Sequence, residues 1–338
     1  MVKIQNIMPV KSRLMHLFLV TCLLLYGSCS NQLFFCPYLA KNNIETSGEN
    51  IFYRDIPYDT KPLNKFDIII PKSNKKVPLV IFIHGGGFTG GDKADVYDRS
   101  KFSAEIKELT SKGIAYATIN YRLLGTSDAS NVMSCLNDSK RCLQFIRHHA
   151  KDFNIDENRI GLYGGSAGAG TSLWLGMSEE MQKNNSTDPV EKKSTRVKAV
   201  AAYATQASYD LYKWDEIFAD YSMTDADIVN IIKPLKIVRF YGISSLPELE
   251  TIEILKVRKN LDLGDLITAD DPPLWIQNPL KTDQKPSNLN ELYHHYKHGE
   301  YLYKKAQNAG INVYSSFPAK TYKSDNYTEL ASFFIKYL

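Results

Sequence analysis

The chain has 338 residues, of which 43% are hydrophobic, and its 41 lysines and arginines against 37 aspartates and glutamates give a net charge of +4. This composition is typical of a folded globular protein and excludes a disordered, collagen-like or low-complexity chain. Because the positive charge is spread along the chain without a dense basic block, nucleic acid is not an expected partner.

The first thirty residues have the pattern of a secretory signal. Basic residues precede an apolar run at 14–26, and small residues around Cys29 follow it. Because the run is shorter than the roughly 20 residues that span a bilayer, we expect residues 1–30 to be a signal peptide and residues 31–338 to act outside the cytoplasm. A cysteine after a small residue resembles the acylation site of bacterial lipoproteins, so release and lipid anchoring at Cys29 on a membrane surface are two alternatives.

Cysteines are scarce beyond the signal. Only Cys36, Cys135 and Cys142 remain, which is too few and too irregular for a disulfide framework or a zinc site. We therefore expect no metal and no other cofactor.

From residue 51 onward, short β-branched or aromatic runs alternate with longer amphipathic stretches. This alternation predicts an α/β fold in which helices flank a mostly parallel sheet on both faces, without a linker to a second domain. The expected strands cover 66–71, 77–83, 114–121, 159–163, 197–203, 273–277 and 311–317. The expected helices cover about 97–112, 135–151, 169–177, 292–308 and 327–338.

The alternation stops between residues 205 and 266. Helical patterns occur there at 225–232 and 246–257, with no clear strand between them. We interpret 205–266 as a helical cap over the catalytic end of the sheet. Its aromatic residues fit a substrate pocket or ordinary core packing; the first of them, with one tyrosine just before the segment, are Tyr203, Tyr209, Tyr212, Trp214, Phe218 and Tyr221.

Residues 164–168 form a Gly-x-Ser-x-Gly motif between an expected strand and a helix of small residues. In this context the motif predicts a nucleophile elbow, a sharp turn that presents the hydroxyl of Ser166 at the edge of the sheet. We expect Ser166 to adopt a sparsely allowed, left-handed backbone conformation. The alternative is a glycine-rich turn that contains a serine by chance.

A run of glycines, His84-Gly85-Gly86-Gly87, follows the expected strand at 77–83. Bare backbone N–H groups at such a position form half of an oxyanion hole. We assign that role to Gly86 and Gly87, together with Ala167 after the nucleophile. A phosphate-binding loop is disfavoured because no Lys-Ser/Thr pair follows the glycines.

Three segments resemble the esterase/lipase-like α/β-hydrolases, a group that includes hormone-sensitive-lipase-like and acetyl- or feruloyl-esterase-like enzymes. They are HGGGF at 84–88, NYRL at 120–123 and DENRIGLYGGSAGAG at 156–170. The resemblance covers about 52–338. It implies an α/β-hydrolase fold, Ser166 as nucleophile, an acid after the strand at 273–277 and a histidine after the strand at 311–317.

The sequence departs from the family pattern in its last part, because no histidine occurs from 299 to 338. The histidines that follow Ser166 are His294, His295 and His298, in a run that leaves the same edge of the sheet. We expect His295, or its neighbour His294, to act as the base; the alternative is an exposed helix face. His84 is interpreted as an orienter of the oxyanion loop.

For the acid, the loop after residue 277 contains Asp283, whose position matches the acid loop of the family. Asp270 and Asp271 precede the strand, and a solvated loop charge is the alternative for Asp283. Asp138 is interpreted as a framework aspartate.

These features predict a serine hydrolase that forms an acyl-enzyme on Ser166 and cleaves a carboxylic ester, of a small molecule or linked to a carbohydrate. The alternative is a binding protein that keeps the fold without turnover, because the usual late histidine is missing. A peptidase of the prolyl-oligopeptidase type is less favoured, because no propeller domain precedes the motif.

Overall fold

The computed structural model describes residues 44–98 and 100–338. Residues 45–338 cluster into one unit. The expected signal peptide at 1–30, with Cys29, and Cys36 lie outside the described residues.

The core of the described chain is a 10-stranded sheet with the order β1-β2-β3-β5-β4-β6-β7-β8-β9-β10. The six strands from β5 to β9 in this order are parallel, and β2, β3 and β10 join it in antiparallel pairs. The mostly parallel sheet predicted from the sequence is therefore confirmed. The strands are β1 (Ile44–Ser47), β2 (Asn50–Pro57), β3 (Lys65–Pro71), β4 (Val77–Ile83), β5 (Ala115–Ile119), β6 (Ile155–Gly165), β7 (Ala199–Tyr203), β8 (Leu274–Gln277), β9 (Val313–Phe317) and β10 (Tyr322–Lys323).

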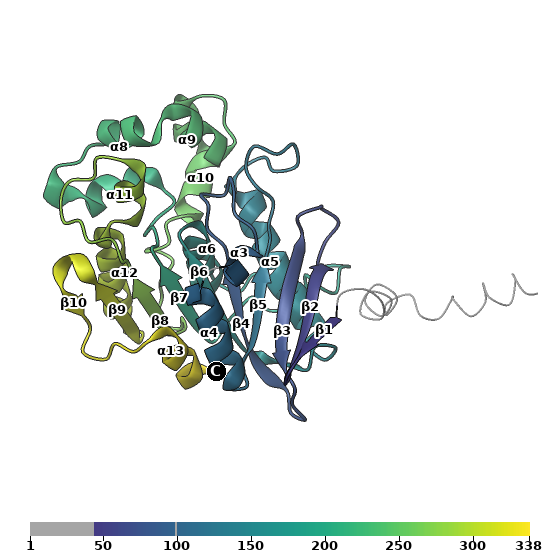
Figure 1. Cartoon of the computed structure of the whole chain (residues 1–338). Helices are drawn as coiled ribbons and strands as arrows, with labels where there is room; N and C mark the ends of the chain where they lie inside the picture. Colours follow the sequence, from purple (N-terminus) through teal and green to yellow (C-terminus); the bar gives the residue numbers. More distant parts are fainter. Residues whose placement is uncertain (1–43, 99) are drawn as a thin grey trace, which may run out of the picture. The chain divides into compact units, whose positions relative to one another are not determined.

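Helices cover both faces of the sheet (Figure 1). The helices α4 and α13 pack together on one face, whereas α5, α6 and α12 lie on the other. This coverage explains why β4 is a nearly continuous apolar run, since a strand buried on both faces has no polar side. The helices around the sheet are α3 (Asp95–Asp98), α4 (Ser100–Ser111), α5 (Val132–His148), α6 (Ala167–Met177), α11 (Leu289–His294), α12 (Tyr296–Ala309) and α13 (Leu330–Tyr337).

The register of the parallel strands aligns their carboxyl ends. Ile83 pairs with Gly164, Gly165 pairs with Tyr203, and Tyr203 pairs in turn with Gln277. The segments that follow β4, β6, β7 and β8 therefore all leave the sheet at one edge, where α/β folds place their ligand sites.

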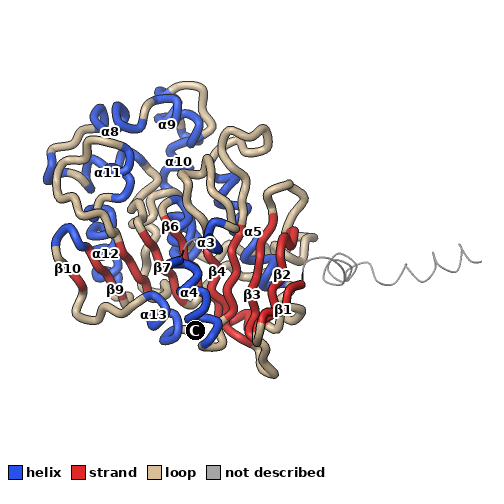
Figure 2. Tube along the Cα trace, viewed as in Figure 1, coloured by secondary structure: helices blue, strands red, loops and turns tan. Residues whose placement is uncertain are grey.

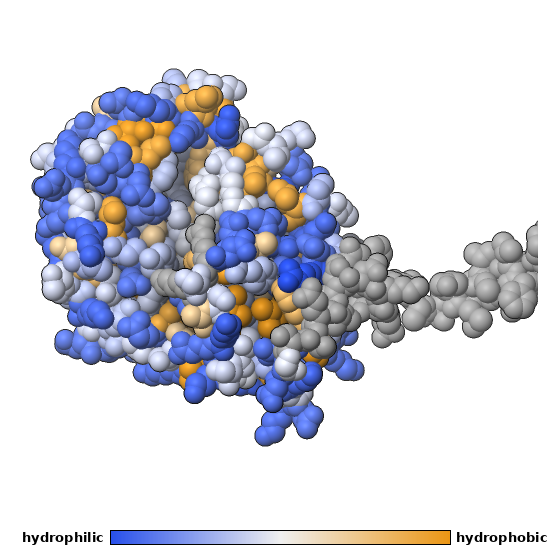
Figure 3. Space-filling view, in the orientation of Figure 1, coloured by the Kyte–Doolittle hydropathy of each residue, from blue (hydrophilic) through white to orange (hydrophobic). Residues whose placement is uncertain are grey.

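Residues 205–266 contain short helices and no strand: α7 (Trp214–Ile217), α8 (Asp225–Ile232), α9 (Pro234–Tyr241) and α10 (Ile252–Asn260), with 3₁₀ turns between them. Figure 2 shows α8, α9 and α10 beyond the upper ends of the strands. Figure 3 shows apolar side chains gathered over the region of α8 and α9, with further apolar groups near the middle and the lower part of the same face. Among the described residues, no helix combines the length and the apolar character needed to cross a membrane.

The helix predicted at 292–308 differs from the structure in a way that matters for function. It begins earlier, at Leu289, and it is interrupted at His295, whose extended conformation (φ −59°, ψ 142°) separates α11 from α12. The buried amide of Asn278 donates to the carbonyls of Thr205 and His295, both at 3.0 Å, and lies 3.4 Å from that of His294. Asn278 thus satisfies carbonyl groups that the end of α11 leaves without helical partners.

Candidate active site

The turn from β6 to α6 holds Ser166 in a strained conformation. Its φ is 54° and its ψ is −119°, so the positive φ expected for a nucleophile elbow is confirmed, while ψ lies outside the left-handed helical well. Glycine is required beside it, because a Cβ on Gly168 would lie 1.9 Å from the carbonyl oxygen of Ile83. Close packing of backbone on backbone therefore dictates the Gly-x-Ser-x-Gly spacing.

The glycine run after β4 passes directly beside the nucleophile. A Cβ on Gly85 would lie 3.3 Å from Cβ of Ser166, and Gly86 and Gly87 both have positive φ values of 104° and 61°. Within the described residues, no hydrogen bond uses the N–H groups of Gly86, Gly87 or Ala167. These are the donors that an oxyanion hole requires.

His84 supports this loop and does not face the nucleophile. Its ring stacks on Tyr121 with 4.4 Å between ring centroids, and its Nδ1 lies 2.8 Å from the carbonyl oxygen of Gly85. The hydroxyl of Tyr121 donates to the carbonyl of His84 at 2.8 Å. The arrangement agrees with the interpretation of His84 as an orienter of the oxyanion loop.

The histidine that contacts Ser166 is His294. Its Nε2 lies 2.9 Å from Oγ of Ser166, which is within the reach required of a general base. Burial lowers the pKa of His294 below its usual value, so the imidazole is neutral and able to accept a proton near pH 7.

The structure does not bring His295, the first candidate for the base, to Ser166; it brings the second candidate, His294. The side chain of His295 is fully buried; its Nε2 lies 3.2 Å from the carbonyl oxygen of Gln284, and its Nδ1 accepts from the N–H of Lys297 at 3.3 Å. Burial lowers its pKa to about 4. The ring of His295 packs against Phe218, with 5.4 Å between the ring centroids.

His298 is also structural. Its Nδ1 accepts from the N–H of Ala207 at 3.2 Å, so its Nε2 donates to the carbonyl of Leu292 at 2.9 Å. Burial lowers its pKa to about 3. His298 therefore fastens α12 to the start of the 205–266 segment.

The structure does not bring Asp283, the predicted acid, to His294. One of its carboxylate oxygens accepts from the hydroxyl of Tyr221 at 2.7 Å, and the other pairs with the ammonium of Lys320. The lysine holds the pKa of this exposed carboxyl well below its usual range. Asp270 and Asp271 pair with Arg196 and are likewise engaged elsewhere.

The residue that does contact His294 is Asn290, which the sequence analysis missed. Its Oδ1 lies 3.0 Å from Nδ1 of His294, on the far side of the ring from Ser166. The two residues are four positions apart on α11 and so share one helix face. The predicted helix began at residue 292 and so did not include Asn290. A helix predicted from residue 289 would have placed Asn290 and His294 on the same face.

Two further contacts connect the 205–266 segment to the site. The hydroxyl of Tyr209 donates to the carbonyl of Ala167 at 2.8 Å, and the ring of Tyr209 contacts Phe88 and Phe240. The segment therefore supplies an aromatic residue, Tyr209, that contacts Ala167 next to Ser166.

Among the described residues, no group of three histidine, cysteine, aspartate or glutamate side chains could hold a metal ion.

Comparison with known proteins agrees with this geometry. Residues 66–232 match the BD-FAE family model. Two solved structures have the same fold at 19% and 17% identity: an acetyl ester-xyloside bifunctional hydrolase from Caldicellulosiruptor lactoaceticus (TM-score 0.53, 75% of this chain and 77% of that one) and esterase B from Lactobacillus rhamnosis (TM-score 0.54, 90% and 83%). The chain has the α/β-hydrolase fold. The resemblance to esterase/lipase-like α/β-hydrolases is thereby confirmed.

Among curated proteins, this chain is similar to gut esterase 1 of Caenorhabditis elegans, with 34% identity over 119 residues. That match covers 33% of this chain and 20% of the relative. An isoprenylcysteine α-carbonyl methylesterase of Arabidopsis thaliana is 27% identical over 161 residues, which are 47% of this chain and 35% of the relative. The chain thus spans about a third or less of the length of these curated relatives.

Proposed function

We propose that the protein is a serine hydrolase that cleaves carboxylic esters through an acyl-enzyme on Ser166, with His294 as the general base. The observation that carries this proposal is the 2.9 Å contact between Oγ of Ser166 and Nε2 of His294. An unaided serine hydroxyl is nearly inert near neutral pH, and a positioned base commonly contributes ~10² to 10⁴ in rate.

In the acylation step, Oγ of Ser166 forms a bond to the ester carbonyl carbon while its proton passes to Nε2 of His294. The N–H groups of Gly86, Gly87 and Ala167 receive the negative charge that develops on the carbonyl oxygen. When the tetrahedral intermediate collapses, His294 gives the proton to the departing alcohol oxygen, and the acyl group remains on Ser166.

Deacylation repeats these steps with water as the nucleophile. His294 takes a proton from the water, the oxygen attacks the acyl carbon, and the same proton returns to Oγ as the acid product leaves. The site therefore performs both half-reactions with one base.

For substrate we propose a small-molecule or carbohydrate-linked ester. The family match, the esterase relatives and the neighbour named as an acetyl ester-xyloside hydrolase support this class. For location, the signal-like pattern of residues 1–30 supports action outside the cytoplasm, with the protein either secreted or held at a membrane surface by a lipid on Cys29.

The alternative of a binding protein without turnover depended on a missing base. No relative supports that alternative, and His294 supplies an imidazole at the nucleophile from another part of the fold. Catalysis is therefore the better account of the site.

The proposal is tested with the full-length protein on p-nitrophenyl acetate. We expect hydrolysis by the wild type, no detectable rate for Ser166→Ala, and a loss of roughly 10² to 10⁴ in kcat for His294→Ala. His295→Gln is the matched control, since glutamine is polar and can still donate to the Gln284 carbonyl; it should keep a rate within about threefold of wild type. A wild type that hydrolyses no aryl ester and does not react with a fluorophosphonate probe would sink the proposal.

A further inference from the structure

The side of His294 that faces away from Ser166 is occupied by an amide. Oδ1 of Asn290 lies 3.0 Å from Nδ1 of His294. An amide oxygen accepts a hydrogen bond but carries no charge, so with Oδ1 in this place the ring proton is on Nδ1. The lone pair of Nε2 then points to the hydroxyl of Ser166, as a general base requires.

We propose that Asn290 is the positioning residue of the site and takes the place of the carboxylate of a Ser-His-Asp triad. This inference rests on the proposed function. Asn290 selects the working tautomer of His294 and fixes the ring plane, but it cannot stabilise the imidazolium by charge. The site thus combines a serine nucleophile with an uncharged positioning residue. No negative charge beside His294 raises its pKa, and burial lowers it.

The helix that carries both residues is held at each end. Asn288 caps its start, with Oδ1 accepting from the N–H of Glu291 at 3.1 Å, and Asn278 binds the carbonyl of His295 at its end. A helix of six residues is not stable alone. These two anchors, independent of the His294 ring, keep Asn290 and His294 on one face.

The charged groups near α11 have interactions that do not involve His294. On α8, which packs against α11, Asp227 pairs with Lys285 at 3.0 Å, and the carboxyl of Asp225 interacts with Asp215 and Arg258. On α11 itself, Glu291 accepts from Ser287 at 2.8 Å, and Asp283 in the preceding loop pairs with Tyr221 and Lys320. On α12 and from α6, the titratable or polar neighbours are His298 and the neutral Ser166. Burial is the cause of the lowered pKa of His294, with no carboxylate opposing it.

This arrangement predicts the effect of adding a charge. In Asn290→Asp, an ionised carboxylate would lie beside Nδ1 and favour the imidazolium, so the acid limb of the kcat/KM profile should move up by about one pH unit. The matched control is Asn288→Asp, which puts the same charge on the same helix, keeps the cap because aspartate caps as well as asparagine, and does not touch the ring. We expect its profile to match that of the wild type.

Removal of the amide tests positioning directly. We expect Asn290→Ala to lower kcat by roughly tenfold to a hundredfold with little change in KM, because a misplaced base costs rate and not substrate binding. Asn288→Ala is the control for a weakened α11, since Asn288 caps the helix but does not touch the His294 ring; we expect its loss in kcat to be clearly smaller. A rate for Asn290→Ala within threefold of wild type, or equal losses in the two alanine variants, would overturn the proposal.

A titration that does not depend on turnover separates this inference from the proposed function. The His294 signal in full-length protein with ¹³C-labelled histidine is identified by its absence in His294→Ala. Its pKa should rise in Asn290→Asp and not in Asn288→Asp; an equal pKa in both variants refutes the role of Asn290, even in an active enzyme. If the pKa rises but the wild type hydrolyses no ester, the role of Asn290 stands and the esterase proposal fails.

Discussion

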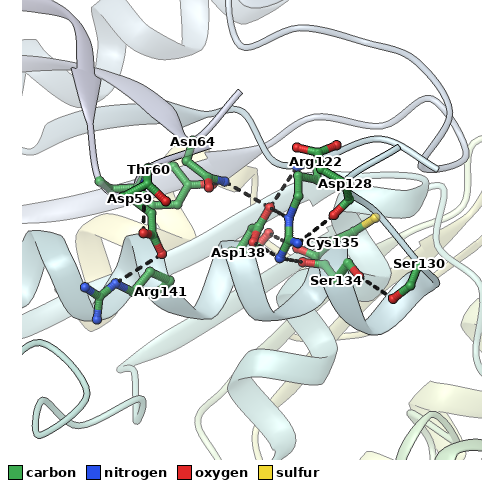
Figure 4. Close-up of polar contacts among 12 residues, drawn as sticks. Asp59, Thr60, Asn64, Arg122, Asp128, Ser130, Ser134, Cys135, Asp138 and Arg141 are labelled. Carbon is green, nitrogen blue, oxygen red and sulfur yellow. Dashed lines mark hydrogen bonds and ion pairs between the residues drawn. The ribbon is translucent and has the colours of Figure 1, made fainter. Parts of the chain in front are cut away.

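The framework beneath the active-site loops depends on one buried carboxylate, Asp138 (Figure 4). Its oxygens accept from N, Nε and Nη2 of Arg122 at 2.9, 2.8 and 2.6 Å, and from Nδ2 of Asn64 at 2.9 Å. The exposed fraction of its side chain is 6%, against 19% for Arg122. These contacts agree with the interpretation of Asp138 as a framework residue.

Loss of this carboxylate would leave the guanidinium of Arg122 without its main partner. Removal of one member of a buried ion pair costs about 3 to 5 kcal/mol. Because Arg122 is partly solvated, we expect the lower end, about 3 kcal/mol, for Asp138→Ala. In a chain of this size each kcal/mol lowers the melting temperature by roughly 2 °C, so the expected loss is about 6 °C.

The assay is thermal unfolding followed by circular dichroism at pH 7, for Asp138→Ala, Arg122→Met and the double variant. We expect the double variant to lose clearly less than the sum of the two single losses, because each single change leaves an unpaired polar partner. A melting temperature for Asp138→Ala within 2 °C of wild type, or additive losses, would refute this reasoning.

Five other substitutions, one of them a control, have definite expected outcomes. Asn278→Ala should lower both the melting temperature and kcat, because the helix that carries the base loses its anchor; a rate equal to that of wild type would contradict this. Gly168→Ala should give no folded protein, since its Cβ would lie 1.9 Å from a carbonyl oxygen, whereas Gly165→Ala, which has open space, should give soluble protein. Burial and a neighbouring aspartate raise the pKa of Asp262 to about 6, so stability from this group is present below about pH 4 and is lost as the pH rises through 6; Asp262→Asn should raise the melting temperature at pH 7 but not at pH 4. Asp283→Asn should keep the ester hydrolysis rate within about threefold, whereas loss of a catalytic acid would cost far more.

The sequence was sufficient to predict the parts of the site that depend on the backbone. An elbow needs glycines at fixed positions between a strand and a helix, and an oxyanion loop needs bare N–H groups after a buried strand, so residues 164–168 and 84–87 have clear patterns. Both segments leave the edge of the sheet that the hydrophobic runs predicted. The strained φ of Ser166 was predictable for the same reason.

The base could not be predicted in the same way, because its identity depends on one backbone break. In a continuous helix from 292 to 308, neighbouring side chains point about 100° apart, and either His294 or His295 could have faced the site. The extended conformation of His295 decides between them, and it is stabilised by Asn278, which lies 17 positions earlier in the chain. No local pattern contains that contact.

The surroundings of Asp283, the predicted acid, could not be predicted for a related reason. In the family pattern, the loops after β8 and β9 carry an acid and a histidine, and in this chain the corresponding loops carry Asp283 and Lys320, which form an ion pair with each other. Asp283, which corresponds by position to the acid of the family, therefore pairs with a lysine and not with a histidine.

The Asp283–Lys320 pair lies beside the break between α11 and α12. Asp283 accepts from Tyr221, and the ammonium of Lys320 lies 5.3 Å from the centre of the Tyr296 ring, the first residue of α12. The two loops of the family's acid and histidine thus meet beside the helix break, next to the segment that carries His294. Catalysis requires only that an imidazole nitrogen reach Oγ of Ser166 in the right tautomer, and it does not require a particular loop to deliver it. Because α11 leaves the sheet at the same edge as Ser166, the Asn290–His294 pair at i and i+4 on one helix meets that requirement in the mechanism that we propose.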